Sequence, residues 1–503
     1  MHEWTVGSNF CMNLQNLFFS TELSSLVSFS PVKPDWKKII LKRKEFPFSR
    51  NVLYERLKIQ NVDRSSKVQT QIELLLQPNT FTITTGHQLC WGTGPLYVIY
   101  KALSVIELCK KLKTMYSEFH FLPVFWLATE DHDYQEVNHF YSDYQNQWFY
   151  KGQFKGAVGR HIIEYTPNLP FWTIQPYQKN ISWKSAFIRL MDEIFYDEPL
   201  IFIDGDDHEL KKLFIPFFLK EITEKKTFYN VQQTNPKLQE KGIRIQWNVL
   251  PINLFYLTNE DRQKIDFKNG KYFVGNQEVN LEWLLNEVQN HPERVSPNAG
   301  FRPLYQEFLL PNLCYVGGWS EIRYWLQLKA NFEDYYVFFP LLLPRFSFVY
   351  IPPDITQKLG ELGFSPDFLL KTLKDIQRTL ANRFYDLEKL KKKSEFFDEN
   401  IIEIQKEVKN LSETLVYSLE SQKVRWHHFY KNLEKKIIKT IQNKDPKLFF
   451  EIYRLKDIVQ PEGFIQERTL NIVSFVKSKE EVVDFMQYLR EQIQTWVEKF
   501  TAY

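Results

Sequence analysis

The chain has 503 residues, of which 44% are hydrophobic and 16% aromatic, and this composition excludes a predominantly disordered protein. The formal net charge is only +3, from 64 basic and 61 acidic residues, so nothing indicates a dedicated nucleic-acid-binding or membrane-surface protein. The sequence does not open with a basic stretch and an apolar core, and its longest apolar run, residues 337–343, is far too short to cross a bilayer. We therefore expect a cytoplasmic globular protein with more than one domain.

The spacing of the cysteines is also typical of a cytoplasmic protein. Cys11, Cys90, Cys109 and Cys314 are widely separated, without a C-x-x-C pair. This spacing argues against a zinc knuckle or a disulfide framework and is typical of a protein in a reducing cytosol.

Residues 81–139 predict the centre of the fold. A short strand opens this segment and leads into a turn that contains Gly86, Gly92 and Gly94, where glycine allows tight turning and close approach to a ligand. Apolar residues then recur at helical spacing, with Pro95 well placed as the first helical residue. The pattern predicts a strand, a glycine-rich turn and a helix.

A second apolar strand is predicted at residues 121–128, and it ends at the polar cluster Glu130-Asp131-His132-Asp133. Two strands joined by a helix form a right-handed crossover unit, in which the strands are parallel. The glycine-rich turn and the polar cluster then fall at the carboxyl ends of neighbouring strands, where open α/β sheets bind ligands. We predict the active site at this edge of the sheet.

Further core strands are predicted at residues 200–203, near 314–316 and at 335–343, because each is a short apolar run. Helices are expected between them, so the core is an α/β structure with a parallel sheet. The last strand is closed by Pro344-Arg345.

Two insertions interrupt this core, at about residues 140–197 and 232–297. The aromatic segments 148–154 and 161–165 predict hairpins in the first, and Asn269-Gly270 predicts a two-residue hairpin turn in the second. Both insertions therefore add β-structure outside the parallel sheet.

Residues 367–445 contain neither Gly nor Pro, and their apolar residues repeat at intervals of three and four, as a coiled-coil seam requires. A single helix of this length would extend about 115 Å at 1.5 Å per residue. We therefore predict a hairpin of two helices, with the bend at residues 389–399 or near Gln422, and interpret it as a dimerisation arm. The predicted domains are 1–365 for the core with its insertions, 366–445 for the coiled-coil arm and 446–503 for a segment that packs back on the core.

The polar cluster after the second strand has three interpretations. Its carboxylates and His132 could hold a cationic amine and move protons during acyl transfer. Alternatively, an aspartate caps a helix and the histidines are structural. If a helix starts within the cluster, His132, Glu136 and His139 share one face, which would permit a metal site and a metal-dependent hydrolase.

Other polar residues extend the candidate site. The glycine-rich turn either offers N–H groups to an anion, which Lys101 could also reach, or is only the tight loop that the crossover needs. Gly317-Gly318 before Glu321 predicts another strand-to-helix turn, where the acid can hold a ribose hydroxyl or an amine. Arg302 and Arg345 are candidate anion clamps, or core ion-pair partners of these acids.

Several motifs occur in a fixed order along the chain. They are Thr85-Gly-His-Gln88, Thr93-Gly-Pro-Leu-Tyr-Val-Ile-Tyr-Lys-Ala102, Phe125-Trp126 with Glu130-Asp-His-Asp133, Arg302-Pro-Leu-Tyr-Gln-Glu307, Gly317-Gly318 with Glu321, and Gln466-Glu-Arg468. In these motifs the sequence resembles the bacillithiol biosynthesis cysteine-adding enzymes, or cysteine ligases, over essentially the whole chain.

The resemblance implies a Rossmann-like core related to class I aminoacyl-tRNA synthetases and nucleotidylyltransferases, with connecting insertions and a C-terminal coiled coil that forms a homodimer. It also implies a ligase that joins cysteine to the glucosamine nitrogen of glucosaminyl malate through a carbon–nitrogen (amide) bond. Because an amide forms only from an activated carboxylate, ATP or ADP is the candidate cofactor, beside a preformed cysteinyl donor or charged tRNA. No metal is expected.

From the motifs and the resemblance we expect one water-accessible hollow where these residues converge. The expected catalytic residues are His132, Glu130, Asp133 and His87. The expected substrate- or nucleotide-binding residues are Thr85, Gly86, Gln88, Gly94, Tyr97, Lys101, Asp131, Arg302, Tyr305, Gly317, Gly318, Glu321 and Arg345. A coiled-coil assembly protein without catalysis is the remaining alternative, and it predicts no small-molecule pocket at the strand ends.

Overall fold

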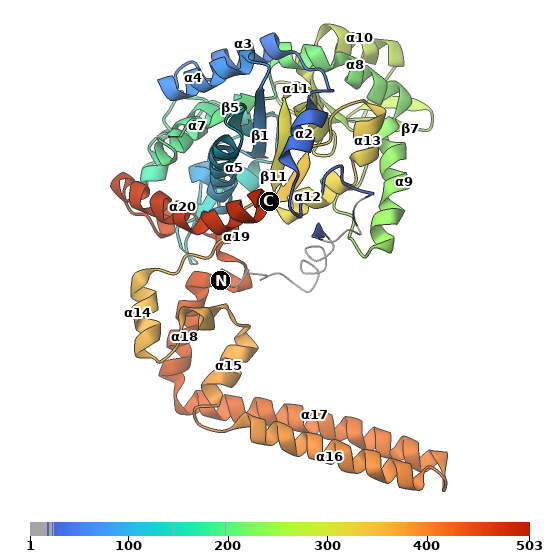
Figure 1. Ribbon diagram of the computed structural model, residues 1–503, viewed down its shortest axis with the longest axis vertical. Coiled ribbons are helices and arrows are strands. Elements are labelled where there is room, and N and C mark those ends of the chain that lie inside the picture. Colours follow the sequence, from blue (N-terminus) through green and yellow to red (C-terminus); the bar gives the residue numbers. More distant parts are fainter. Residues whose placement is uncertain (1–17, 20–22, 24, 144, 197, 503) are drawn as a thin grey trace. The chain divides into compact units, whose positions relative to one another are not determined.

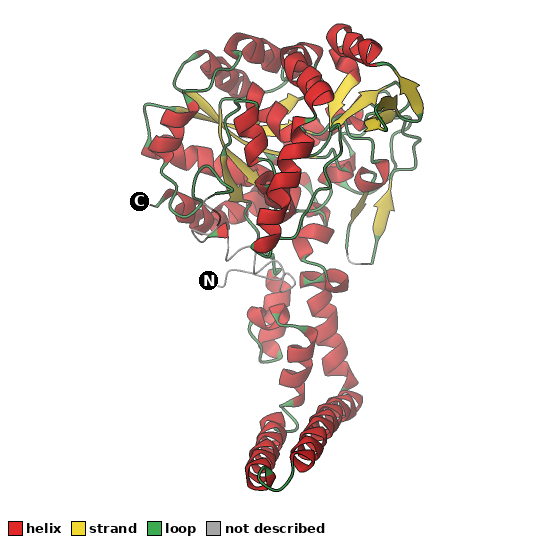
Figure 2. Ribbon diagram, turned by 90° about the vertical axis from the view of Figure 1, so that its right-hand side faces the viewer, coloured by secondary structure: helices red, strands yellow, loops and turns green. Residues whose placement is uncertain are grey.

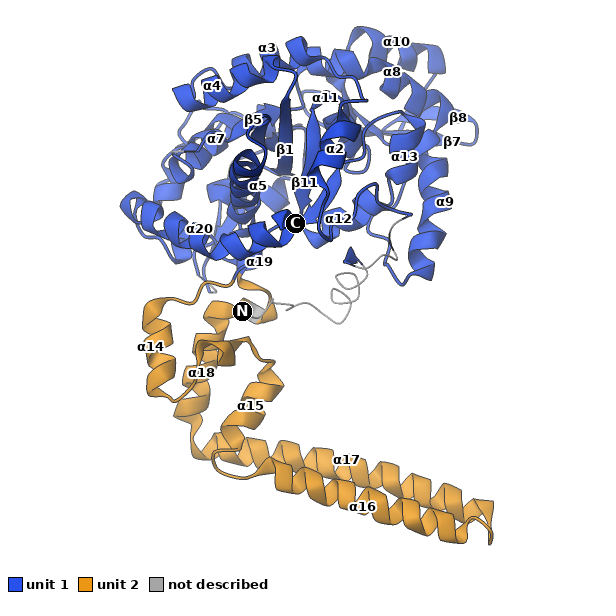
Figure 3. Ribbon diagram, in the orientation of Figure 1, with its two compact units in different colours: residues 1–348, 467–503 blue, residues 349–466 orange. Residues whose placement is uncertain are grey.

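A computed structural model describes residues 18–19, 23, 25–143, 145–196 and 198–502, so Cys11 lies outside the described residues. The chain divides into two compact units (Figure 3). Unit 1 comprises residues 1–348 and 467–503, and unit 2 comprises residues 349–466. The unit boundaries therefore differ from the predicted domain boundaries at 365 and 445: unit 2 begins earlier and extends beyond the coiled-coil arm.

The centre of unit 1 is a parallel five-stranded sheet (Figure 1). Its strands are β1 (Thr80–His87), β2 (His120–Leu127), β5 (Ile201–Asp204), β11 (Asn312–Gly317) and β12 (Leu341–Pro344). They lie in the order β12-β11-β1-β2-β5, so the chain builds outward from β1 in one direction and then returns to build in the other. This is the doubly wound order of a Rossmann-like sheet, and its switch point falls between β1 and β11. The predicted fold class is confirmed.

Strand β2 shows why the sheet carries helices on both faces. Leu122, Val124 and Trp126 point into one core cluster, where the Trp126 ring lies 5.5 Å from that of Tyr305. Phe125 points the other way and lies 6.1 Å from Phe187. Since successive side chains of a strand alternate between faces, an uninterrupted apolar run is what a strand buried on both sides requires.

The helices of unit 1 cover both faces of this sheet (Figures 1 and 2). In chain order they are α2 (Trp36–Arg43), α3 (Arg50–Gln60), α4 (Ser66–Glu73), α5 (Tyr97–Met115), α6 (Tyr134–Val137), α7 (Trp183–Ile194), α8 (His208–Glu224), α9 (Lys226–Glu240), α10 (Leu281–Asn290), α11 (Arg302–Leu309), α12 (Trp319–Leu326), α13 (Lys329–Asp334) and α20 (Lys479–Thr501). Helix α5 connects β1 to β2, as predicted, although it begins at Tyr97 and not at Pro95. Helix α20 packs against α5 and α7.

The two insertions carry β-structure, as predicted. The second forms an antiparallel sheet of β6 (Leu254–Leu257), β7 (Arg262–Lys268), β8 (Lys271–Val274), β9 (Gln277–Val279) and β10 (Val295–Pro297). Asn269 and Gly270 both have positive φ between β7 and β8, which confirms the predicted turn. In the first insertion a hairpin joins β3 (His139–Tyr141) to β4 (Gln147–Phe149), so the predicted segment 148–154 enters a hairpin only at its first residues. The segment 161–165 forms no hairpin, and only the isolated bridge between Ile162 and Ser182 is present there.

The last core strand is shorter than predicted. Only residues from Leu341 onward pair with β11, whereas the prediction began at residue 335. Tyr336 has a φ of 53°, a left-handed conformation that follows the end of α13 and that an extended strand cannot contain. Apart from the exposed Tyr336, the apolar run is buried, but its first half turns away from the sheet.

Unit 2 consists of helices and loops, with no strand among its residues (Figure 2). Its helices are α14 (Pro353–Glu361), α15 (Leu373–Ala381), α16 (Leu387–Val408), α17 (Glu413–Lys444) and α18 (Pro446–Val459), and α19 (Gln466–Thr469) begins at the unit boundary. Helices α16 and α17 form the predicted coiled-coil hairpin. In the described part of the chain no helix is long and apolar enough to span a membrane.

Both predicted positions for the bend of this hairpin are wrong, because α16 continues through residues 389–399 and α17 through Gln422. The chain turns at residues 409–412. Leu411, which fits the apolar repeat of the seam, is 77% exposed there, and Ser412 has the extended conformation of a helix N-cap.

Candidate active site

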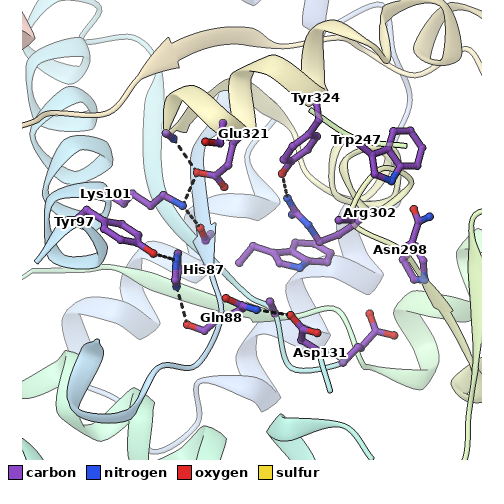
Figure 4. Close-up of a pocket in the computed structure, with 18 of the residues that line it drawn as sticks. His87, Gln88, Tyr97, Lys101, Asp131, Trp247, Asn298, Arg302, Glu321 and Tyr324 are labelled. Carbon is purple, nitrogen blue, oxygen red and sulfur yellow. Dashed lines mark hydrogen bonds and ion pairs between the residues drawn. The ribbon is translucent and has the colours of Figure 1, made fainter. Parts of the chain in front are cut away.

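A cavity of about 740 Å³ lies at the carboxyl ends of β1, β2 and β11, beside the switch point of the sheet (Figure 4). Gly86, His87 and Gln88 line it from the end of β1, and Glu130 and Asp131 line it from the loop after β2. The turn after β11 and helix α12 add Gly318, Ser320, Glu321 and Tyr324. This part of the lining comes from the strand ends, where the sequence predicted a site.

A buried ion pair joins two walls of the cavity. Lys101, from α5, is 2% exposed, and its Nζ lies 2.6 Å from Glu321 Oε2 and donates to Gly86 O at 2.8 Å. Glu321 also accepts hydrogen bonds from the Tyr315 hydroxyl at 2.7 Å and the Gly318 N–H at 2.8 Å. Burial alone would raise the pKa of Glu321, but Lys101 and these donors lower it to about 2. The pair ties α5 to the β11–α12 turn.

His87 is a neutral side chain at neutral pH. Burial, together with the nearby charge of Lys101, lowers the pKa of its imidazole to about 3. Nδ1 lies 3.1 Å from Gln88 O and Nε2 lies 2.8 Å from the Tyr97 hydroxyl. Because a carbonyl only accepts, Nδ1 carries the proton and Nε2 accepts from Tyr97. The adjacent Cys90 is no nucleophile paired with His87, since burial raises the pKa of its thiol to about 12.

The carboxylates of Glu130 and Asp131 form the acidic side of the cavity. Gln88 Nε2 donates to Asp131 Oδ2 and to Glu136 Oε2, both at 2.6 Å, and so links the end of β1 to the loop after β2. Arg262, from the second insertion, approaches Asp131 Oδ1 to 3.6 Å. Glu130 is buried, and Lys211 Nζ lies 2.7 Å from its Oε1.

The guanidinium groups that line the cavity differ in their partners. Arg345 binds the buried Glu467 bidentately, with N–O distances of 2.9 and 2.6 Å, so its charge is already compensated. Arg302 donates to Gln306 Oε1 at 2.8 Å and to the Tyr324 hydroxyl at 3.2 Å, which are neutral groups. Neither Arg302 nor Arg468 forms an ion pair with a carboxylate of the described residues. An anionic ligand would find these two charges uncompensated.

Two family models match the chain. The model described as "Bacillithiol biosynthesis BshC, N-terminal Rossmann-like domain" matches residues 18–346, and "Bacillithiol biosynthesis BshC, C-terminal coiled-coil domain" matches residues 348–501. The chain belongs to the BshC family. The resemblance inferred from the motifs is thereby confirmed.

Individual BshC relatives agree along nearly the full length. A protein of Cytophaga hutchinsonii named "Putative cysteine ligase BshC" is 34% identical over 482 residues, which cover 92% of this chain and 91% of the relative. One of the same name from Flavobacterium johnsoniae is 33% identical over 493 residues, with coverages of 92% and 91%. A third, from Salinibacter ruber, is 26% identical over 504 residues, with coverages of 91% and 90%.

The structure brings most of the expected site residues of this BshC chain to the cavity. Those that line it are Gly86, His87, Gln88, Tyr97, Lys101, Glu130, Asp131, Arg302, Gly318, Glu321 and Arg345. Those that do not line it are Thr85, Gly94, His132, Asp133, Tyr305 and Gly317. The expected convergence therefore applies to Glu321 but not to Gly94 or His132.

Several residues outside the lining have a physical reason for their place. Thr85 donates to Val316 O at 2.7 Å inside the sheet, and the Tyr305 hydroxyl donates to Gly205 O at 3.0 Å in the core. His132 and Asp133 are exposed to solvent. Thr85 and Tyr305 therefore stabilise the core, whereas His132 and Asp133 face the solvent.

Backbone groups of the glycine-rich turn form hydrogen bonds within the protein. Asn471 Nδ2 donates to Gly92 O and Gly94 O, each at 2.6 Å. The Gly94 N–H donates to Trp91 O and the Leu96 N–H to Leu470 O, both at 2.9 Å. Since these donors are used, the part of the turn beyond Gln88 does not form the anion cradle that the sequence allowed.

The helix required by the metal interpretation does not form. Helix α6 begins only at Tyr134 and ends at Val137, and His139 lies in strand β3. His132, Glu136 and His139 therefore share no helical face. Within the described ranges, no group of three or more His, Cys, Asp or Glu side chains is placed to hold a metal ion.

Sequence reasoning missed the cavity residues that come from the insertions and the C-terminal part of the chain. They include Trp247, Phe255, Arg262, Asn298 and Arg468. For Arg468 a signal existed, because it belongs to the motif Gln466-Glu-Arg468. The residues of the second insertion do not follow a strand of the parallel sheet in sequence, and no local pattern marks them.

The close approach of β1 to β2 at Gly86 gives a prediction for stability. A Cβ added at Gly86 would lie 2.8 Å from Trp126 O and 2.9 Å from Trp126 Cβ. Gly86→Ala should therefore lower the free energy of unfolding by about 1–3 kcal/mol, measured by urea denaturation. As a control, Gly360→Ala in α14 meets no atom within 4 Å and should gain up to about 1 kcal/mol. Equal stability of the two variants would contradict the tight contact.

Proposed function

We propose that this chain is a cysteine ligase that joins the carboxyl group of cysteine to the glucosamine amine of glucosaminyl malate, forming an amide. Membership of the BshC family supports the ligase class. The observation that carries the proposal is a cavity at the sheet's switch point with carboxylates on one side and, on another, guanidinium groups to which the described residues offer no carboxylate partner. Joining these substrates requires a site that binds both the amine of the glucosamine and the carboxylates of the substrates.

The chemistry assigns different roles to the two sides. An attacking amine must lose a proton as its nitrogen bonds to the acyl carbon, and the buried carboxylate Glu130 lies in the cavity to take it. Malate carries two carboxylates, one of which Arg302 can bind. The proposal gives the exposed His132 and Asp133 no contact with the reacting groups.

The proposal also includes a nucleotide. ATP is the proposed source of the activated acyl group, because water does not allow a free carboxylate to form an amide unaided. The guanidinium groups of the cavity fit a phosphorylated ligand, whereas the closed turn at Gly92–Gly94 does not. Calorimetric titration with ADP, wild type against Arg468→Gln, tests this binding independently of activity: weaker binding to the variant is expected, and equal binding would contradict the placement.

The direct test is a reaction of the purified chain with glucosaminyl malate, cysteine and ATP, followed by mass spectrometry. We expect a product whose mass is the sum of cysteine and glucosaminyl malate minus one water. Omitting ATP should abolish the product. Absence of the product with all three present, from a protein shown to be folded, would contradict the proposed function.

Arg302 gives a prediction for substrate affinity. Arg302→Gln should raise KM for glucosaminyl malate by about 10- to 100-fold, because a hydrogen bond to a charged group contributes about 1.5–3 kcal/mol. The KM for cysteine should change little. Arg189→Gln, at an exposed position of α7 away from the cavity, is the matched control and should leave both values within about twofold. An unchanged KM for the malate substrate in Arg302→Gln would exclude this anion contact.

We also propose that the coiled-coil hairpin forms a homodimer. The side chains of Phe396, Tyr417 and Phe429 are exposed on α16 and α17, which leaves apolar surface for a second copy to cover. Light scattering should give twice the chain mass of 60.6 kDa. The double variant Phe396→Glu with Phe429→Glu should be monomeric, and a monomeric wild type at micromolar concentration would contradict the proposal.

A further inference from the structure

A row of alternating charges leads from the surface to the cavity. Arg160 binds Asp206 bidentately, with N–O distances of 2.6 and 2.7 Å. Asp206 Oδ1 lies 2.8 Å from Lys211 Nζ, and Lys211 Nζ lies 2.7 Å from Glu130 Oε1. Of these four side chains only Glu130 lines the cavity. The other three lie behind the cavity wall, and the proposed function gives them no role.

Lys211 is fixed from three directions. Its side chain is 0% exposed, and its ammonium group contacts Glu130, Asp206 and, at 3.3 Å, the backbone oxygen of Glu293. An ammonium group has three N–H donors, so this set uses all of them. A buried lysine is costly unless it is paired, and here the partners also fix its geometry. The carboxylate of Glu130 is thereby held at one place on the cavity wall.

The charges around Glu130 come from several elements. The titratable and charged groups that face it are Lys211 of α8, Asp206 before α8, Arg160 of the first insertion, Arg262 of β7, Tyr305 of α11 and its own neighbour Asp131. Burial raises the pKa of Glu130, and Lys211 is the largest influence that opposes it. Without Lys211, burial and the carboxylate of Asp206 would both favour the protonated form of Glu130, and Arg262 would oppose them.

We propose that Lys211 is a positioning residue for ligation, which keeps the Glu130 carboxylate ionised and fixed where the attacking amine must release its proton. The inference rests on the proposed function. In that step a bond forms between the amine nitrogen and the acyl carbon. The bond from the acyl carbon to its leaving oxygen breaks, with the electron pair staying on the oxygen. The proton of the nitrogen moves to Glu130.

The test is the pH profile of kcat/KM in Lys211→Met. The acid limb of the profile, which reports protonation of Glu130 in the free enzyme, should move upward by about 1–3 pH units. At a pH on that limb, the rate should fall about tenfold for each pH unit by which the limb has moved, and it should recover at higher pH. Lys211→Arg, which keeps the charge, should return the limb toward the wild-type position. A purely structural role of Lys211 would lower the rate at every pH without moving the limb.

The controls separate folding from function. If Lys211→Met fails to fold, Lys211→Gln, which loses the charge but keeps a polar end that can donate to Glu130 and Asp206, takes its place and carries the same expectation. Lys110→Met is the matched control, because Lys110 also pairs with a buried carboxylate, Glu198 at 2.6 Å, but lies outside the cavity lining; its limb should not move. An unmoved limb in a folded Lys211 variant overturns the inference. Failure of the proposed function would be seen instead as an inactive wild type.

Discussion

Replacement of Glu130 by Gln is expected to lower kcat for amide formation by about 10²–10⁴-fold, the range that a positioned general base contributes. Glutamine has the same shape as glutamate but cannot accept the proton of the amine. Lys211 keeps Asp206 as a partner at 2.8 Å, so the variant should fold. Because the loss is in proton transfer, KM for both substrates should change much less than kcat. Initial rates measured across a range of substrate concentrations separate the two quantities.

His132→Ala is the matched control for this experiment. His132 lies two residues from Glu130 in the same polar cluster, but it is exposed and outside the cavity lining. We expect its kcat to stay within about tenfold of wild type. A Glu130→Gln variant that is folded and retains a tenth or more of the wild-type kcat would remove Glu130 from the mechanism, and a larger loss in His132→Ala would move the base to that residue.

Lys101→Met is expected to lower the free energy of unfolding by about 3–5 kcal/mol, because it leaves Glu321 buried without its cation. The double variant Lys101→Met with Glu321→Gln should recover much of this loss, since the uncompensated charge is gone. Urea denaturation of the two single variants and the double variant forms a cycle that measures the coupling. Additive effects in that cycle would show that the contact of 2.6 Å between Lys101 and Glu321 contributes little.

We expect the unfolding free energies of the wild type and of Lys101→Met to depend on pH in opposite directions. In the wild type, the pKa of Glu321 falls from the ordinary value of 4.5 to about 2 on folding. The stabilisation, about 3 kcal/mol, is complete above pH 4.5 and is lost as pH falls toward 2. In Lys101→Met burial dominates and raises that pKa, so the variant should lose stability as pH rises above 4.5. The difference in unfolding free energy between wild type and variant, measured from about pH 3 to 7, should therefore grow with pH; a constant difference would contradict the assignment.

The sheet and the acidic side of the cavity could be predicted because their signals are local. Strands buried on both faces read as apolar runs, and Glu130 and Asp131 directly follow one of them. The parallel arrangement then brings the strand ends together without any knowledge of distant contacts. The place of Glu321 in the site could be predicted in the same way, because it follows the end of β11.

Long-range contacts decided the features that the sequence did not predict. The anion cradle at Gly94 is absent because the Gly94 N–H bonds to Trp91 O and the Leu96 N–H bonds to Leu470 O, from a residue remote in sequence. Arg345 fits an anion clamp until Glu467 is placed against it. At Leu411 the coiled-coil repeat continues through the bend, so neither a glycine nor a break in periodicity marks where the helices turn.

The closing of the β1–α5 turn by Leu470 and Asn471 has a consequence for biosynthesis. Asn471, Glu467 and helix α20 are all needed to finish unit 1, yet they are translated after the whole of unit 2. During translation, the α/β core therefore lacks the contacts of Glu467, Asn471 and α20 until the last residues of the chain leave the ribosome. The helical hairpin of unit 2 can fold before that point. Stop codons or ribosomal stalling anywhere before residue 467 should yield a polypeptide that chaperones retain and proteases remove.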